Sequence, residues 1–201
     1  MKPITNWNEV KAPTEYVELP AGGYVCKIMG AKVETYSSRN GDTFEKLVVA
    51  IDITEGDFAN YYADNYRSQQ GEKKWKGNLY FYVPSDDGSE KDEFSKRILK
   101  GFTEAVETSN TGYSWDWDES KLKGKKVGVI FRREEWEYNG KTGWRTAPFK
   151  AIDCTAAASG DFKMPADKPL ANSPATAQTP SYSAFANANF EEVGNEEDLP
   201  F

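Results

Sequence analysis

Apolar and polar residues alternate along the stretch 43–54, which is typical of a strand with one buried face. Its inward positions are Leu47, Val49, Ile51 and Ile53, and its outward positions are Lys46, Val48, Ala50 and Asp52. In the stretch 22–34, the even-numbered residues up to Ile28 are predicted to face inward, and from Ala31 onward the odd-numbered residues are. Gly30 lies at this change, so the sequence predicts a β-bulge or sharp bend there. A long bent strand suits a small barrel, because it pairs with a different neighbour at each end.

Three further strands are predicted beyond these two. The stretch 77–83 alternates and is ended by a proline, after a long polar loop over 55–75. The stretches 122–138 and 144–154 flank an Asn-Gly dipeptide at 139–140, which is typical of hairpin turns. These last two stretches are therefore predicted to pair as a β-hairpin.

Between the third and fourth strands the apolar spacing becomes helical. Ser89 stands three residues before Asp92, the spacing of a capping box, and the helix is predicted to end near 109–110. The apolar stripe of this helix consists of Phe94, Ile98, Leu99, Phe102, Ala105 and Val106.

The order of these elements predicts an all-β fold with one helix. Five strands with a helix between the third and fourth is the order of the OB-fold, a partly open Greek-key barrel, here over residues 20–155. Residues 1–19 are predicted to form an N-terminal arm. Residues 156–189 are rich in Ala, Ser, Thr, Pro and Asn, which is typical of a disordered linker, and residues 190–201 form an acidic tip.

The charge is distributed unevenly along the chain. The net charge is −7. Residues 1–155 hold 23 Lys and Arg against 25 Asp and Glu, whereas residues 156–201 hold 2 against 7. Most of the acidity therefore belongs to the tail, and the nearly neutral body is able to carry a locally basic face.

The composition disfavours catalysis and metal binding. Histidine, the commonest general base and metal ligand, is absent. Cys26 and Cys154 lie in predicted strands without CxxC spacing and are interpreted as buried thiols. The acidic clusters at 86–87 and 116–119 are typical of solvated turns, and no glycine-rich phosphate loop occurs. We therefore expect no metal, no cofactor and no enzymatic activity.

The sequence also predicts where the protein acts. The first seven residues lack the apolar core of a signal peptide, and no window of the chain approaches a membrane span. We expect a soluble cytoplasmic protein without a membrane partner.

Aromatic and basic residues interleave on the predicted strands and loops. Single-stranded nucleic acid needs flat rings for its bases and cations for its phosphates. On an OB barrel the face of strands two and three and the loops after strands one and four form the usual ligand surface. The candidate DNA-binding residues there are Tyr36, Arg39, Lys73, Lys74, Trp75, Tyr80, Tyr82, Arg132, Trp136, Tyr138, Trp144 and Arg145. The alternative for each ring is a place in the core, which we assign to Phe81.

The last residues add a second signal. Glu196, Glu197 and Asp198 precede the apolar tip Leu199, Pro200 and Phe201. With this tip, the OB-like element order and the low-complexity linker, the chain resembles bacterial and phage single-stranded DNA-binding proteins, whose acidic tips end in Pro-Phe. The long loop between the second and third predicted strands, residues 55–75, fits a phage or mobile-element relative.

The resemblance implies a protein that coats single-stranded DNA without strong sequence preference during replication, recombination or repair. It also implies that the tip, residues 196–201, recruits partner proteins of those processes. RNA is an alternative ligand, because stacking rings accept either strand type, and a homo-oligomer is compatible with this family.

The tip has a physical rationale as a docking peptide. An apolar end flanked by carboxylates suits a small hydrophobic pocket rimmed with Lys and Arg. The linker has a typical reach of roughly 30–35 Å, so the tip is able to fold back onto the protein's own basic groove and compete with DNA. A tail kept only for solubility is the alternative interpretation. The alternative function is a protein-interaction adaptor whose barrel binds no nucleic acid.

Overall fold

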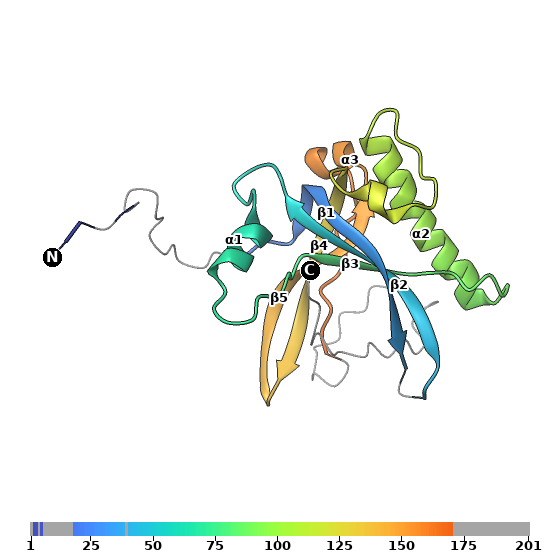
Figure 1. The fold of residues 1–201 in the computed structure, drawn as a ribbon, viewed down its shortest axis with the longest axis horizontal. Helices are drawn as coiled ribbons and strands as arrows, with labels where there is room; N and C mark the ends of the chain where they lie inside the picture. The colour runs from blue at the N-terminus through green and yellow to red at the C-terminus, as the bar shows by residue number, and fades with distance from the viewer. Residues whose placement is uncertain (1, 4, 6–17, 39, 171–201) are drawn as a thin grey trace.

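The computed structural model describes residues 2–3, 5, 18–38 and 40–170. Most of the predicted arm, Arg39, most of the linker and the whole acidic tip therefore lie outside the described residues. The described chain forms one five-stranded antiparallel sheet with three α-helices (Figure 1). The strands are β1 (Gly22–Ser37), β2 (Thr43–Ile53), β3 (Asn78–Tyr82), β4 (Lys126–Tyr138) and β5 (Lys141–Ile152), in the sheet order β3-β2-β1-β4-β5.

The first strand holds the sheet together, as the sequence predicts. The N-terminal part of β1 pairs with β4, and the part from Cys26 onward pairs with β2. The register of the β1–β2 ladder shifts between Ile28 and Gly30, which confirms the predicted bulge. Because the bulge reverses the parity of β1, Ile28 and Ala31 both face the core.

The predicted hairpin of the last two strands is also confirmed. Tyr138 pairs with Lys141 across a two-residue turn, in which Asn139 and Gly140 have positive φ angles of 49° and 71°. Asn-Gly adopts this type I′ geometry readily. Figure 1 shows the β1–β2 and β4–β5 hairpins extending in the same direction, away from the end of the sheet that carries α3.

The core lies on the inner face of this sheet. The four predicted inward residues of β2 are only 0–3% exposed. Leu79 and Phe81 of β3 are also buried in this core. Val48, Ala50 and Asp52 were expected to face solvent, but they are buried as well. Val48 stands between the long side chains of Lys32 and Tyr80 in the adjacent strands, and Asp52 lies against a helix, so small outward residues are covered.

The predicted helix is α2 (Glu90–Ser109). The Ser89 hydroxyl accepts a hydrogen bond from the Asp92 backbone N–H at 3.1 Å, as the capping spacing predicts. Phe102 is buried and stacks on Phe81 of β3, with ring centroids 4.4 Å apart. The stripe is buried only in its C-terminal half, because Phe94 and Ile98 remain 43% and 45% exposed.

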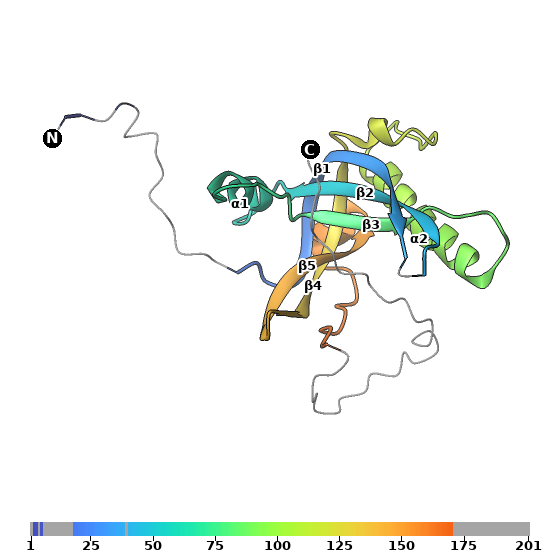
Figure 2. The ribbon, with the colours of Figure 1, turned by 60° about the horizontal axis from the view of Figure 1, so that its bottom comes forward.

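The prediction of a single helix is wrong, because two short helices accompany α2. Helix α1 (Tyr61–Ser68) lies within the expected long loop, and α3 (Cys154–Ser159) follows β5. Both are too short for a clear apolar period. Figure 2 shows α1 at one end of β2 and β3 and α2 at the other. No helix among the described residues is long and apolar enough to cross a membrane.

The short helices are held by contacts distant in sequence. The N-cap residue Asn60 makes no side-chain cap, and instead the Asp52 carboxylate of β2 accepts from the backbone N–H groups of Tyr62 and Ala63. Helix α3 lies over Gly128 of β4, where a Cβ atom would come within 2.7 Å of the Ala157 side chain. These contacts explain why local sequence alone does not reveal the two helices.

The sheet remains open. Strands β3 and β5 stand at its two ends, and no ladder joins them in the part of the chain that the structure describes. Helix α2 contacts β3, β4 and β5 and so spans this opening. The five antiparallel strands and the position of α2 between β3 and β4 agree with the prediction, and the sheet is not closed into a barrel.

The packed chain continues past residue 155. Phe162 lies against Gly23 of β1, and Lys168 forms a parallel bridge with Glu134 at the edge of β4. The Leu170 N–H donates to the Glu135 carboxylate at 3.0 Å. The described chain therefore ends beside the β4–β5 hairpin.

Candidate nucleic-acid interface

Five side chains form one surface on the outer face of β1, β2 and β3. In the register of these strands, Tyr36 pairs with Phe44 and Lys46 pairs with Tyr82. Tyr80 has the same parity as Tyr82, so it lies on the same face. We call this surface the aromatic–lysine face, and it consists of Tyr36, Phe44, Lys46, Tyr80 and Tyr82.

The ammonium group of Lys46 lies among the four rings of this face. Its Nζ atom is 4.8 Å from the ring centroid of Tyr82, and 5.2 Å, 5.6 Å and 5.8 Å from those of Tyr36, Phe44 and Tyr80. Each distance is within the range of a cation–π interaction. A cation and several flat rings therefore occupy one small area.

The rings follow one another across the strands. Tyr36 and Phe44 are nearly parallel, with centroids 5.8 Å apart and 12° between their planes. Phe44 continues to Tyr82 at 5.4 Å and 43°. The Nζ atom of Lys91, in the first turn of α2, lies 5.7 Å from the Tyr82 ring. The face thus has a second cation at its β3 margin.

A carboxylate borders this face on β1. The Tyr36 hydroxyl donates to Glu34 at 2.7 Å, and Lys32 forms an ion pair with the same carboxylate at 2.6 Å. Burial and the hydrogen bond to Glu34 raise the pKa of Tyr36 well above its ordinary value. The Tyr36 phenol therefore stays neutral and fixed in orientation at physiological pH.

Three candidates from the sequence, Tyr36, Tyr80 and Tyr82, come together on this face. Phe44 and Lys46 were not among the candidates, although the outward parity of Lys46 in β2 is visible in the sequence. The signal that identifies them is the strand register, which places β2 between the tyrosines of β1 and β3.

The candidates before β3 lie elsewhere. Trp75 is half-buried, and its indole N–H is shared between the carbonyl oxygens of Ile51 and Gly77, each at 3.2 Å. Lys73 donates to the Arg67 carbonyl at 3.0 Å, and the Lys74 backbone N–H donates to the Gln69 side chain at 2.8 Å. Trp75 therefore anchors the segment around α1, and its ring packs beside those of Tyr62 and Tyr66.

The hairpin candidates divide between two faces. Directly opposite residues share a face, and Trp136 pairs with Gly143, whereas Trp144 pairs with Glu135. Trp136 and Trp144 therefore lie on opposite faces of the hairpin. The residues with the parity of Trp136 are Arg132, Tyr138 and Arg145, the last opposite Glu134.

The side of Trp136 continues the outer face of the sheet. Val129 and Phe131 of β4 are buried in the core, so the alternate residues Arg132 and Trp136 point outward. The Arg132 guanidinium lies 4.0 Å from the Phe149 ring centroid and forms an ion pair with Glu134 at 2.8 Å. Trp136 covers Gly143, where a Cβ atom would lie only 2.7 Å from the indole.

On the inner side of the hairpin, Trp144 is paired with a different arginine. The Arg133 guanidinium is 5.0 Å from the Trp144 ring centroid, and Trp144 is 37% exposed. Trp136 and Tyr138 therefore share the outer side of the hairpin, and Trp144 lies on its inner side. The structure therefore supplies two distinct aromatic–arginine pairs where the sequence suggested one surface.

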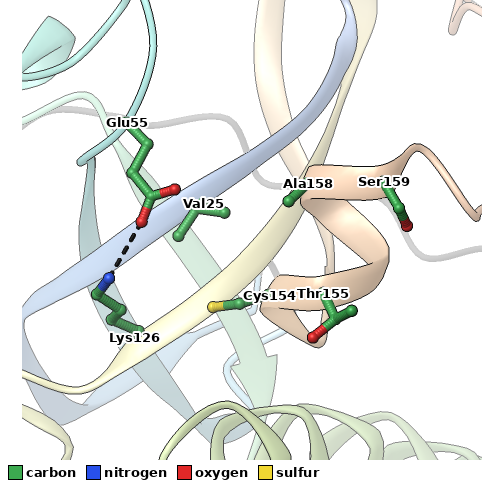
Figure 3. Close-up of a pocket in the computed structure, with 7 residues that line it drawn as sticks. All are labelled: Val25, Glu55, Lys126, Cys154, Thr155, Ala158 and Ser159. Carbon is green, nitrogen blue, oxygen red and sulfur yellow. Dashed lines mark hydrogen bonds and ion pairs between the residues drawn. The ribbon is translucent and has the colours of Figure 1, made fainter.

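A separate hollow lies between α3, β1 and β4 (Figure 3). Val25, Cys154 and Ala158 line it, and Glu55 and Lys126 form an ion pair of 3.1 Å across its rim. Burial raises the pKa of the Cys154 thiol, which disfavours the nucleophilic thiolate. Among the described residues no group of His, Cys, Asp or Glu side chains is arranged to hold a metal ion.

We compared the chain with known protein families and with curated proteins. No protein-family model matches the chain, and no curated protein matches its sequence.

Proposed function

We propose that this chain is a single-stranded DNA-binding protein, and that the aromatic–lysine face is the centre of its binding surface. The observation that carries the proposal is the position of the Lys46 ammonium group within 6 Å of four ring centroids. Binding without strong sequence preference needs rings for the bases and cations for the phosphates, and both are present on one face.

The arrangement suggests how a strand is held. Bases stack on the outer sides of Tyr36, Phe44 and Tyr82, and each stacked base contributes on the order of 1–3 kcal/mol. Lys46 and Lys91 neutralise phosphates that pass between the rings. Toward the other end of the sheet, Trp136 and Arg132 extend the path along the outer face.

The topology supports an OB-fold assignment within this proposal. The order β3-β2-β1-β4-β5, the bent first strand and the helix between β3 and β4 are those of a Greek-key barrel that is open between β3 and β5. The aromatic–lysine face then corresponds to the ligand surface expected of such a barrel.

The tail completes the proposal as a recruiting element. Its tip, residues 196–201, docks on replication, recombination or repair proteins in the cytoplasm of a bacterium or phage-infected host. A flexible chain as long as residues 171–201 has an end-to-end distance of about 30 Å. The described chain ends beside the β4–β5 hairpin, so a linker of this kind allows the tip to reach the aromatic–lysine face.

Fluorescence anisotropy of a labelled oligo-dT tests this function. We expect binding at low salt that weakens on Tyr82→Ala by about 1–3 kcal/mol, the contribution of one stacked base. Trp144→Ala is the matched aromatic control, because Trp144 is 37% exposed and lies on the inner side of the β4–β5 hairpin, away from the outer face. An affinity unchanged by Tyr82→Ala would reject the face as the binding centre.

One observation favours a second function, the protein-interaction adaptor. Trp117 is 79% exposed and has a positive φ of 67°, a strained conformation for a bulky residue. Its loop also carries Asp116 and Asp118, which oppose contact with nucleic acid. An exposed indole is typical of protein-binding hot spots. Failure of the wild-type protein to bind oligo-dT or oligo-U at low salt would leave this function as the better one.

A further inference from the structure

Glu34 is a negative charge beside a face that is suited to bind an anionic polymer. It stands two residues before Tyr36 on the outer side of β1, directly opposite Lys46. A carboxylate in this position repels phosphates unless its charge is compensated. Its ion pair with Lys32, at 2.6 Å, supplies that compensation.

The two carboxylate oxygens of Glu34 are fixed by different partners. Lys32 contacts Oε1, and the Tyr36 hydroxyl donates to Oε2 at 2.7 Å. The side chain is 16% exposed, so solvent still reaches it. Because a carboxylate oxygen accepts two hydrogen bonds, each oxygen retains one acceptor site in a defined orientation next to the Tyr36 ring.

We propose that Glu34 reads the base that stacks at Tyr36 and Phe44, and that it favours guanine over thymine at this position. This inference rests on the proposed function. Bases of single strands are open to hydrogen bonding on their Watson–Crick edges. Guanine presents two adjacent donors there, N1–H and the N2 amino group, which match the two oxygens of a carboxylate.

Thymine offers a different edge to the same carboxylate. Its single N3–H donor lies between two carbonyl oxygens, and these repel a carboxylate. The preference is confined to one base in the bound strand, so the protein still coats mixed sequences. A hydrogen bond of this kind changes affinity by about threefold to tenfold.

The experiment compares oligo-dT with an oligomer of equal length built from TTG repeats, in lithium buffer to prevent four-stranded guanine structures. We expect the wild-type protein to bind the TTG oligomer about threefold to tenfold more tightly. In Glu34→Gln the ratio of the two affinities falls to about one, because the amide keeps only one acceptor oxygen. The affinity for oligo-dT rises, since a negative charge has been removed, whereas the TTG oligomer also loses its contact with Glu34 and gains less.

Glu45→Gln is the matched control. It removes the same charge from the neighbouring strand, but Glu45 lies opposite Thr35 with the parity of the other face, and it is exposed. This variant keeps the wild-type affinity ratio if Glu34 reads the base. A purely electrostatic role of Glu34 moves both affinities and leaves the ratio unchanged.

The outcomes separate this inference from the proposed function. Equal wild-type affinity for the two oligomers overturns base reading while single-strand binding stands. A guanine preference that survives in Glu34→Gln overturns the assignment to Glu34. Absence of wild-type binding to either oligomer overturns the proposed function and this inference together.

Discussion

Lys46 on β2 lies directly opposite Tyr82 on β3, and its ammonium nitrogen is 4.8 Å from the centre of the tyrosine ring. A cation beside a ring is able to neutralise the phosphate of a nucleotide while the ring supports its base. Under the proposed function, stacking and charge neutralisation are therefore supplied by adjacent residues.

The proposed contact between Lys46 and a phosphate predicts how the affinity for DNA depends on salt. If Lys46 neutralises one phosphate, Lys46→Ala reduces the slope of log affinity against log salt by about 0.7. Oligo-dT titrations at several salt concentrations measure this slope. Lys100→Ala is the control, because Lys100 is an exposed lysine of α2 paired only loosely with Glu104 at 3.6 Å. An unchanged slope in Lys46→Ala would remove this lysine from the phosphate path.

The hairpin predicts an asymmetry between its two tryptophans. If single-stranded DNA binds along the outer face, it contacts Trp136 and not Trp144, because these residues lie on opposite sides of the β4–β5 ladder. We expect Trp136→Ala to weaken oligo-dT binding by about 1 kcal/mol or more, and Trp144→Ala to leave it unchanged. The reverse pattern would place the strand on the inner side, beside Arg133.

The positions of Trp136 and Trp144 on opposite faces of the hairpin could have been predicted from the sequence. The two-residue turn at Asn139-Gly140 forces Tyr138 to pair with Lys141, and counting back from this pair puts Trp136 and Trp144 on opposite faces. The same reasoning succeeded for the bulge at Gly30. The pairing register of two strands can thus be predicted from the sequence where a tight turn or a bulge at a glycine determines it.

Other features depend on contacts that no local pattern reveals. Helix α1 forms where Asp52, ten positions before Tyr62, supplies the acceptor for its first N–H groups. Lys46 is surrounded by four aromatic rings only because β1 and β3 both flank β2. Sequence parity predicted that Lys46 points outward, but not which rings surround it.

The support of α1 by Asp52 predicts a stability effect. The buried carboxylate accepts from Tyr62 N at 2.9 Å and from Ala63 N at 3.1 Å. Asp52→Ala leaves these donors without their acceptor, and we expect a loss of about 1–3 kcal/mol in the free energy of unfolding. Urea denaturation measures it, with the exposed Asp57→Ala as the control, for which we expect a change within about 0.5 kcal/mol.

A second buried carboxylate predicts a pH dependence. The hydrogen bond from Lys96, followed by those from the backbone of Asp86 and Gly88, lowers the pKa of Asp92 below its ordinary value. A lowered folded-state pKa stabilises the protein above the unfolded pKa of about 3.9, and this stability is lost as pH falls through the folded pKa.

Urea denaturation at a series of pH values below about 5 checks this dependence. We expect the wild-type free energy of unfolding to fall with pH, and Asp92→Asn to have a shallower dependence. Some dependence remains in the variant, because hydrogen bonds from Ser89 and from Ser120 also lower the pKa values of Asp87 and Asp118, respectively. Identical pH profiles for the two proteins would contradict the role of Asp92.

The tail predicts opposite effects on two kinds of binding. The described chain ends beside the β4–β5 hairpin, and the acidic tip beyond it carries five carboxylate side chains within residues 191–198. If the tip competes with DNA for the basic outer face, deleting residues 191–201 leaves oligo-dT affinity unchanged or raises it, most clearly at low salt where the charges are least screened. Binding of partner proteins is lost in the same deletion. Phe201→Ala is the matched comparison: it removes only the terminal ring and keeps every carboxylate, so we expect it to abolish partner binding and to leave oligo-dT affinity unchanged. A deletion that abolishes oligo-dT binding would show that the tail is part of the binding surface and not its competitor.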